Sequence, residues 1–184
     1  MASPLFMIIS IMYCFGDSKG PLFFTQQRYG RNEKIFYIYK FRSMVVNADE
    51  ILKRNKVLYQ KYILNNYKLE PDEDPRITRL GRILRRFSLD ELPQLINVLK
   101  GDMSLVGPRP IVEEELNEYE NKRHDLLAVK PGMTGYWQVC GRSDVGYPER
   151  VDLELYYVYH QCISLDIKIL LRTISVVVLK KGAY

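Results

Sequence analysis

The chain has 184 residues, of which 47% are hydrophobic and 27% are charged, so it can bury the core of one domain. These proportions exclude an intrinsically disordered chain. The net charge of +5 and the pI of about 9.0 indicate an anionic partner, which can be a nucleic acid, a phospholipid surface or a phosphorylated small molecule.

The cysteines and histidines are few and scattered. Cys14, Cys140 and Cys162 form no Cys-x-x-Cys pair, and His124 and His160 are far apart in the sequence. This pattern argues against a disulfide framework or a zinc site and favours a reducing, cytosol-facing location. We expect the three cysteines to be buried as small apolar side chains.

Residues 5–15 are almost wholly apolar and follow directly after Ser3-Pro4. A helix of this length rises about 17 Å, which is too short to span a hydrocarbon core of about 30 Å. It can dip into a membrane, lie flat on its surface or be a buried core helix, and the abrupt chain break at residues 16–21 favours the membrane. The segment has no basic n-region and no small-residue cleavage site, so it does not read as a secretory signal.

Residues 22–27 and 34–41 are rich in β-forming side chains and flank a Gly-Arg-Asn turn, which predicts a β-hairpin. Asn47 and the acidic pair after it predict the start of a charged helix that runs to about residue 65. Residues 76–87 then predict an amphipathic basic helix, with arginine at every third position: Arg76, Arg79, Arg82 and Arg85.

Two adjacent carboxylates, Asp90 and Glu91, stand between this basic helix and an apolar one. Ser88 followed by Glu91 forms a capping-box pattern, which predicts that both carboxylates lie in a first helical turn, although Pro93 complicates the register. An acidic first turn is also what any well-capped helix looks like. As a site, two carboxylates among many arginines can share a divalent metal with a phosphate.

Three later segments carry weaker signals. Gly107, Pro108 and Pro110 restrict the backbone around Arg109, so its guanidinium is held with little freedom to lose. Residues 130–143 mix glycines and aromatics, which suits either phosphate contact or a strand and turn with a buried Trp137. Residues 111–125 predict a polar helix without a site signal, and residues 163–179 predict an interfacial or packed helix rather than a spanning one.

Together these motifs resemble the bacterial sugar transferase family, the monotopic phosphoglycosyl transferases, over nearly the whole chain. The matching motifs are Ser3-Pro4, Gly20-Pro21, Gln26 to Gly30, Lys40 to Met44, Asp74-Pro75-Arg76, Ser88 to Leu95, Gly101 to Ser104, Val106 to Pro110, Pro131 to Gly135, Trp137-Gln138-Val139, Gly141-Arg142, Leu165-Asp166 and Lys181 to Tyr184. Because so many motifs match in order, chance is a poor explanation.

The resemblance implies transfer of a sugar 1-phosphate from a UDP-sugar to polyprenyl (undecaprenyl) phosphate, with release of UMP and initiation of a glycan. By the family pattern Asp90 is the nucleophile, Glu91 its partner, and both bind Mg²⁺. The same pattern assigns phosphate or substrate contacts to five further residues: Lys40, Arg85, Arg109, Arg142 and Asp152. The physical chemistry fits, because phosphoryl transfer asks mainly for positioning and charge neutralisation.

The resemblance also implies a single domain over residues 1–184 with an α+β, mostly helical fold. Within it we expect a small β-hairpin, amphipathic membrane-interface helices, a membrane-associated helix at residues 3–16 and a catalytic portion at residues 17–184. Only Met1-Ala2 precede Ser3-Pro4, so we expect a truncated version of the family's re-entrant helix.

The implied location is monotopic, on the cytoplasmic face of the bacterial inner membrane. The expected partners are the donor, the lipid acceptor and membrane lipids but no nucleic acid, with homo-oligomerisation left open. Two alternatives remain at this point, namely a non-catalytic basic protein that binds anionic lipid or nucleic acid, and a remnant that keeps the fold without turnover.

Overall fold

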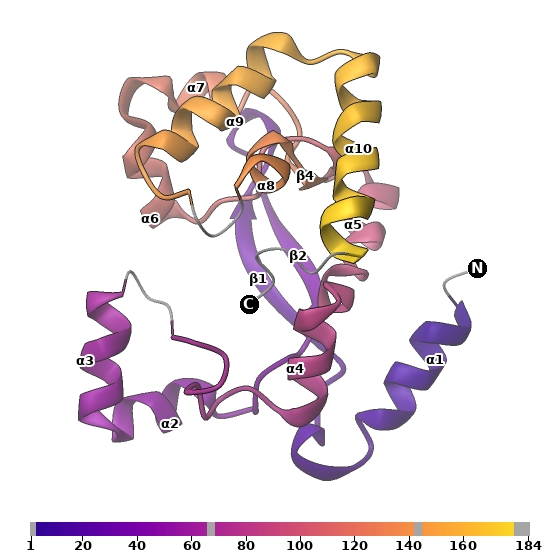
Figure 1. Ribbon diagram of the computed structural model, residues 1–184, viewed down its shortest axis with the longest axis vertical. Coiled ribbons are helices and arrows are strands. Elements are labelled where there is room, and N and C mark those ends of the chain that lie inside the picture. Colours follow the sequence, from indigo (N-terminus) through magenta and orange to yellow (C-terminus); the bar gives the residue numbers. More distant parts are fainter. Residues whose placement is uncertain (1–2, 66–68, 142–144, 179–184) are drawn as a thin grey trace. The chain divides into compact units, whose positions relative to one another are not determined.

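The computed structural model describes residues 3–65, 69–141 and 145–178, and most of these are helical (Figure 1). The chain forms two compact units. The first comprises Met1–Phe24 and Phe41–Asp90, and the second comprises Thr25–Lys40 and Glu91–Ala183. Asp90 and Glu91, although consecutive, therefore belong to different units.

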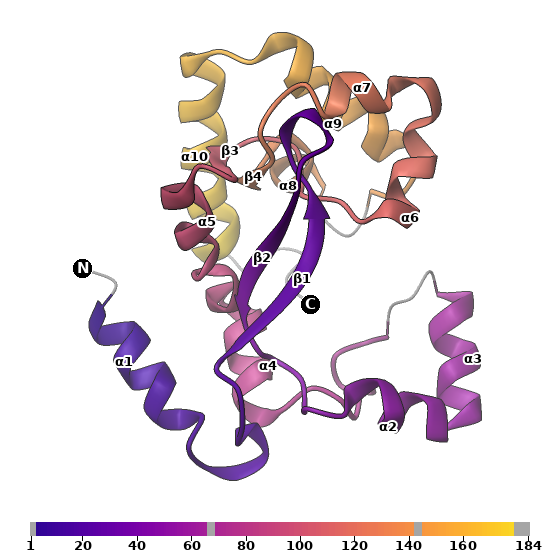
Figure 2. The same cartoon turned by 180° about the vertical axis from the view of Figure 1, so that it is seen from behind.

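The predicted β-hairpin is confirmed. Strand β1 (Phe23–Tyr29) pairs with β2 (Ile35–Phe41), and the short 3-10 turn η2 (Arg31–Glu33) joins them, as Figure 2 shows from behind. Asn32 and Glu33 adopt left-handed backbone conformations with φ of 56° and 60°, and the Gly30 N–H donates to the Lys34 carbonyl at 2.8 Å. The hairpin begins in the first unit, turns within the second and ends in the first.

The described part of the first unit includes the helices α1 (Ser3–Met12), α2 (Ala48–Arg54), α3 (Lys56–Leu64) and α4 (Arg79–Arg86) and the 3-10 turn η1 (Gly16–Ser18). The single charged helix predicted to run to about residue 65 is wrong, because the chain breaks at Asn55. Asn55 has extended φ and ψ of −97° and 92°, and its side chain accepts the Leu58 N–H to cap α3. Asn47, by contrast, makes no side-chain cap on α2.

Helix α1 forms within the apolar N-terminal segment and leaves much of its surface exposed. Ile9 and Tyr13 are buried, whereas Met7, Ile8 and Ile11 are each more than half exposed. Within the described residues, no helix has the length and apolar character that crossing a membrane requires. The prediction that the segment cannot span alone agrees with this finding.

Helix α4 is shorter than predicted, because Thr78 caps it by accepting the Gly81 N–H and Arg76 lies before its start. Arg76 is therefore not part of an exposed basic face. It is buried and forms an ion pair with Asp74 at 2.8 Å. Gly81 allows α4 to approach the strand end, since a Cβ there would lie 1.9 Å from the Ser43 carbonyl oxygen.

The capping box predicted at Ser88 is wrong. Ser88 has φ of 54°, and Asp90 and Glu91 lie in a separate 3-10 turn, η3 (Leu89–Glu91). Helix α5 (Gln94–Lys100) begins only afterwards, with Pro93 at its N-cap, so Pro93 costs it no internal hydrogen bond.

The second unit contains a parallel pair of short strands, β3 (Ser104–Val106) and β4 (Gly132–Thr134), with Ser104 opposite Gly132. This pair was not predicted. Gly132 is required there, because a Cβ at that position would lie 2.1 Å from the Gly107 backbone nitrogen. Helix α8 (Tyr136–Cys140) follows β4 and packs against both α9 (Glu149–His160) and α10 (Ile163–Val178) (Figure 1).

The predicted polar helix over residues 111–125 is wrong, because three short elements replace it: α6 (Glu113–Leu116), η4 (Asn117–Lys122) and α7 (Arg123–Leu126). Glu120, with φ of 46°, breaks the run. Their apolar side chains join α9 in the main core cluster of this unit, which contains Ile111, Leu116, Tyr119, Leu126, Leu127, Val151 and Leu155.

Two expectations about exposure have different outcomes. Cys14, Cys140 and Cys162 are all exposed, so the expectation that they are buried is wrong. Helix α10 buries Ile169 but exposes Ile163, Ile167, Leu171 and Ile174. That exposure is compatible with an interfacial helix, and a contact with lipid stays a prediction.

Candidate functional site

A small recess in the second unit gathers residues from the hairpin, the last residue of η3, α5, the loop after β3, β4 and α8. Its cavity volume is about 10 Å³, which makes it a shallow recess that opens to solvent. Its lining consists of Arg28, Ile38, Lys40, Glu91, Gln94, Arg109, Pro110, Gly132, Met133 and Gln138. Three of these side chains are cationic and one is a carboxylate, so the recess has an excess of positive charge.

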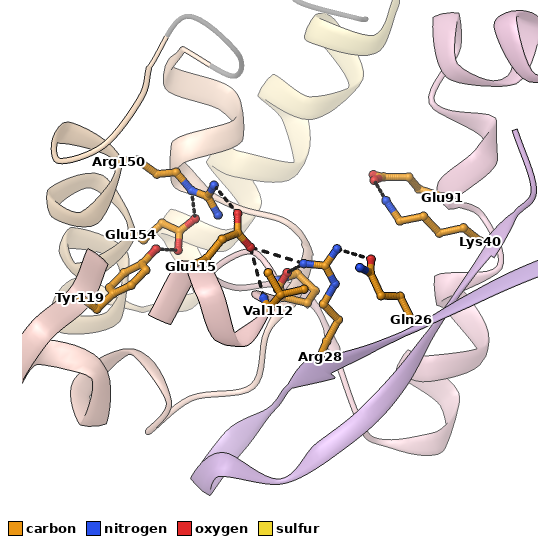
Figure 3. Close-up of polar contacts among 10 residues, drawn as sticks. Gln26, Arg28, Lys40, Glu91, Val112, Glu115, Tyr119, Arg150 and Glu154 are labelled. Atoms are coloured by element: carbon orange, nitrogen blue, oxygen red, sulfur yellow. Dashed lines mark hydrogen bonds and ion pairs between the residues drawn. The ribbon is translucent and has the colours of Figure 1, made fainter. Parts of the chain in front are cut away.

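Lys40 and Glu91 form the polar pair of this recess (Figure 3). The Lys40 Nζ donates to Glu91 Oε1 at 2.7 Å, and the two side chains are 20% and 27% exposed. Lys40 comes from the end of β2 and Glu91 from η3, 51 positions later. The pair is therefore formed by the fold and remains accessible to a ligand.

Arg109 and Arg28 bring two guanidinium groups to the same recess. Burial and the nearby charge of Arg109 lower the pKa of Arg28 to about 10, with Glu115 acting in the opposite direction. Pro108 and Pro110 flank Arg109 as the sequence shows, and Pro110 also lines the recess. Two cations held this close together attract an anion.

Two carboxamide side chains, Gln94 and Gln138, complete the polar lining. Gln94 is 2% exposed. Gln138 Nε2 donates to the Met133 carbonyl at 3.3 Å, whereas its Oε1 is buried and has no hydrogen-bond partner within the described residues. A buried acceptor left in this condition is an unusual and costly feature, which a donor on a ligand or water would relieve.

In the first unit, Arg85 lies near the predicted nucleophile Asp90. Burial lowers the pKa of Arg85, and the Asp90 carboxylate acts in the opposite direction, so the two groups are within electrostatic range. The Arg85 Nε also donates to Ser43 Oγ at 2.8 Å. Ser43 fixes Arg85 without neutralising it, so the positive charge of Arg85 can act on an anion or on Asp90.

The remaining predicted site residues stand apart from the recess or outside the description. Arg142 lies outside the described residues. Asp152 is on α9, is 76% exposed and pairs with Lys122 at 3.7 Å, and it does not line the recess. The structure thus brings Lys40, Glu91 and Arg109 together, and a contact between Asp152 and substrate stays a prediction.

The donor set is compatible with Mg²⁺. Within the part of the chain that the structure describes, no group of three or more His, Cys, Asp or Glu side chains could hold a metal ion. Mg²⁺ needs fewer, since it is usually bound by one or two carboxylates while substrate phosphates and water complete the shell. Asp90 and Glu91 are two carboxylates of this kind, and a magnesium site formed by them stays a prediction.

Several residues of the site region were missed from the sequence. Arg28 was not among the predicted site residues, and Glu115 lies in the segment to which no site signal was assigned. Glu115 looks in sequence like one of three solvated acidic residues, Glu113, Glu114 and Glu115. The sequence does contain one signal of the charged cluster around Glu115. Arg150 is followed four residues later by Glu154, a spacing that pairs opposite charges on a helix.

Comparison with known proteins shows the family of the chain. The family model of the bacterial sugar transferase matches residues 1–180. The undecaprenyl-phosphate galactose phosphotransferase of Salmonella typhimurium is 49% identical over 187 aligned positions, which cover 100% of this chain and 38% of that protein. The exopolysaccharide production protein ExoY of Sinorhizobium fredii is 41% identical, covering 99% of this chain and 80% of that protein.

A third relative, the galactosyl transferase CpsE of Streptococcus agalactiae, is 47% identical over 89% of this chain and 36% of its own length. The chain thus spans well under half of the Salmonella and Streptococcus relatives and most of ExoY. Since a single family model covers almost every residue, the chain belongs to the bacterial sugar transferase family.

Proposed function

We propose that this chain transfers a sugar 1-phosphate from a UDP-sugar to undecaprenyl phosphate and releases UMP. Membership of the sugar transferase family and the names of the relatives support this proposal. The product, a lipid-linked sugar diphosphate, would start the assembly of an exopolysaccharide, a capsule, an O-antigen or a glycoprotein glycan. Because two relatives are named for galactose, UDP-galactose is the first donor to test.

The observation that carries the proposal is the cationic recess that contains Glu91, the residue peptide-bonded to Asp90. Arg28, Lys40 and Arg109 supply three cations there. The cavity volume of the recess is only about 10 Å³, far below the 300–1,000 Å³ that is typical of small-molecule pockets. The diphosphate of the donor would therefore bind against the cationic side chains that line the recess and not inside a preformed cavity.

In the proposed first step a carboxylate oxygen of Asp90 attacks the β-phosphorus of the UDP-sugar. The new bond joins that oxygen to phosphorus, the bond between the β-phosphorus and the bridging oxygen breaks, and UMP leaves with that oxygen. In the second step an oxygen of undecaprenyl phosphate attacks the same phosphorus, and the carboxylate of Asp90 is released. One covalent relay thus replaces a direct reaction between two anions.

Charge is the main barrier to this attack, because an ionised carboxylate approaches an anionic diphosphate. Arg109 and Arg28 would hold the diphosphate oxygens, and Arg85 would act on the side of Asp90. Glu91 and Asp90 would hold Mg²⁺. When bound there, the ion would further neutralise the phosphate oxygens. Lys40, paired with Glu91 in the structure, could then donate to a phosphate instead.

A lipid acceptor also accounts for the apolar surface of α1, where Met7, Ile8 and Ile11 are exposed. We propose that this helix associates with the membrane and that the enzyme acts at its cytoplasmic face as a monotopic protein. The excess of basic residues suits anionic head groups.

The experiment is an assay of UMP release. The protein would be incubated with Mg²⁺, undecaprenyl phosphate and each of UDP-galactose, UDP-glucose and the N-acetylated UDP-sugars, with parallel samples containing EDTA. We expect UMP from at least one donor, and its loss with EDTA and return when Mg²⁺ is restored. Failure to release UMP from any donor would contradict the enzyme proposal and favour a basic protein that binds anions without turnover.

A further inference from the structure

A chain of alternating charges is joined to the recess through Arg28, the one member of the chain that the proposed chemistry uses directly (Figure 3). It runs from Arg28 to Glu115, then to Arg150, Glu154 and Tyr119. All five residues belong to the second unit, and their side chains come from β1, α6, α9 and η4. Two arginines face two carboxylates, so the cluster is close to neutral as a whole.

Arg28 is the member that reaches the recess. One of its terminal nitrogens, NH1, donates to the Pro110 carbonyl at 3.2 Å and to Glu115 Oε2 at 3.4 Å, and the other, NH2, donates to Gln26 Oε1 at 2.7 Å. A guanidinium has five N–H donors, so two of them are not used by these contacts. One of the two is Nε, which is buried without a partner within the described residues.

Glu115 joins Arg28 to the rest of the cluster. Its Oε2 accepts from Arg28 and from the Val112 N–H at 3.2 Å, and its Oε1 accepts from Arg150 NH1 at 3.1 Å. Burial by itself would raise the pKa of Glu115, but Arg150, Arg109, the Val112 N–H and Arg28 together lower it. The carboxylate is therefore ionised at neutral pH and is bound from three directions.

Arg150 is in turn held so that it cannot turn away from Glu115. Its Nε donates to Glu154 at 3.1 Å, and its guanidinium lies over the rings of Trp137 and Tyr147 at 4.3 Å and 4.9 Å. Glu154, which is 1% exposed, also accepts the Tyr119 hydroxyl at 2.7 Å. A side chain with this many fixed partners is a rigid support.

We propose that Glu115 is a positioning residue, which holds Arg28 at the recess so that its guanidinium can bind a phosphate there, and which is itself fixed by Arg150. This inference deepens the proposed function and rests on it for the identity of the ligand. Glu115 is an anion and would repel a phosphate, so any favourable effect it has on phosphate binding must act through Arg28.

The sign of the effect of Glu115→Gln on anion binding separates positioning from charge. If Glu115 acts only through its charge, removing that charge makes the recess more positive and strengthens binding. If Glu115 positions Arg28, the amide NH₂ of glutamine must face Arg28 or Arg150, both of which are donors. At the Oε2 position the NH₂ would oppose both Arg28 and the Val112 N–H, and at the Oε1 position it would oppose Arg150, which fixes Glu115. In either orientation Arg28 loses support, and binding weakens.

The primary test is calorimetric titration of inorganic pyrophosphate into the full chain and its variants, which does not depend on turnover. We expect Glu115→Gln to weaken pyrophosphate binding about tenfold or more. Glu114→Gln is the matched control, because this neighbour on α6 is exposed and its loss removes the same charge. Binding by Glu115→Gln that is unchanged or tighter would overturn the inference, as would failure of the unaltered protein to bind pyrophosphate.

A double-mutant cycle tests whether the effect passes through Arg28. In a background of Arg28→Ala, adding Glu115→Gln should cause no further loss of pyrophosphate affinity, whereas independent effects would add. Further weakening of similar size in that background would contradict positioning.

Thermal melting of each variant checks the fold. Glu154→Gln perturbs the cluster without touching Arg28, so it should lower the melting temperature with a smaller effect on binding.

The kinetic counterpart uses UMP release. If the proposed function holds, Glu115→Gln should raise KM for the UDP-sugar about tenfold while kcat changes by less than about threefold. Rescue by Glu115→Asp should be partial, since a carboxylate is kept but shortened. If no donor yields UMP, the proposed function fails, and pyrophosphate binding still decides whether Glu115 positions Arg28.

Discussion

Two groups of paired charges, one in each unit, show how differently the same residue types can be used. In the first unit Arg76 donates through Nε and NH2 to the two oxygens of Asp74, both at 2.8 Å, and both side chains are at most 7% exposed. In the second unit Lys40 and Glu91 are 20% and 27% exposed and share a recess with Arg28 and Arg109. The closed pair, Arg76 and Asp74, is therefore neutral and buried. The open cluster, Lys40 and Glu91 with Arg28 and Arg109, has more cations than anions.

This difference separates a structural from a functional ion pair. The groups of a buried pair that satisfy each other have little charge left to attract a ligand. Removal of one partner destabilises the fold, because the other charge then stays buried without compensation. A partly exposed pair among additional cations keeps attraction for an anion. The following predictions test that distinction, beginning with the largest effect.

The open cluster should control activity. Lys40→Ala removes one of three cations from the recess and leaves Glu91 without its 2.7 Å partner. We expect kcat/KM for UMP release to fall about 100-fold or more, because charge neutralisation dominates phosphoryl transfer. The free energy of unfolding should change by no more than about 1 kcal/mol, because the pair is partly exposed. Lys34→Ala, an exposed lysine just before β2, is the matched control and should retain activity.

The closed pair should control stability. Asp74→Asn keeps the side-chain shape but leaves the buried Arg76 guanidinium without its counter-charge, so we expect the free energy of unfolding to fall by about 3 kcal/mol. Urea denaturation measures this loss, with Glu73→Gln as an exposed control of the same charge change. UMP release per folded molecule should persist at temperatures where the variant is folded. A stable but inactive Asp74→Asn would remove the distinction between the two pairs.

The contact between Tyr119 and Glu154, at the buried end of the Glu115 cluster, should contribute to stability, as the closed pair does, but by a smaller amount. Tyr119→Phe removes the hydroxyl that donates to Glu154 at 2.7 Å, and we expect a loss of about 1–2 kcal/mol in the free energy of unfolding. Tyr159→Phe serves as a control, since that hydroxyl is exposed and bonds to Asp125. Equal losses in the two variants would show that burial does not set the value of these contacts.

The pH dependence of stability should show the smallest effect. The folded-state pKa of Glu115 is lowered from its ordinary value of 4.5, so its contribution is present above that value and is lost as the pH falls through the lowered pKa. Glu115→Gln should therefore flatten the decline of stability below about pH 4.5, while Glu114→Gln should not. Denaturation midpoints measured between neutral pH and pH 3 would check this, and identical profiles for both variants would contradict it.

Local patterns predicted those parts of the fold that local physics controls. The β-forming residues around the turn of the hairpin and the apolar segment at residues 163–179 were sufficient to place the hairpin and α10. The capping box at Ser88 failed because the chain turns there with φ of 54°, so that η3 and α5 are separate elements. A four-residue motif cannot reveal that a turn has replaced the start of a helix.

In the candidate site, too, local sequence predicted some features, and others depend on contacts that form only on folding. Asp90, Glu91, Lys40 and Arg109 were identified from motifs, yet the ion pair between Lys40 and Glu91 joins positions 51 residues apart and is visible only after folding. Glu115 looks like its solvated neighbours, because nothing in the local sequence distinguishes it. Its role depends on Arg28 and Arg150, which are 87 and 35 residues away.

The central claim is that Asp90 carries the phosphosugar, and intact-mass measurement of the protein tests it most directly. The protein would be incubated with Mg²⁺ and a turned-over UDP-sugar without lipid acceptor, alongside Asp90→Asn and Glu91→Gln. We expect a mass increase of one sugar phosphate less one water in the unaltered protein and none in a folded Asp90→Asn. An adduct that persists in Asp90→Asn, or UMP release that never produces an adduct, would contradict the account.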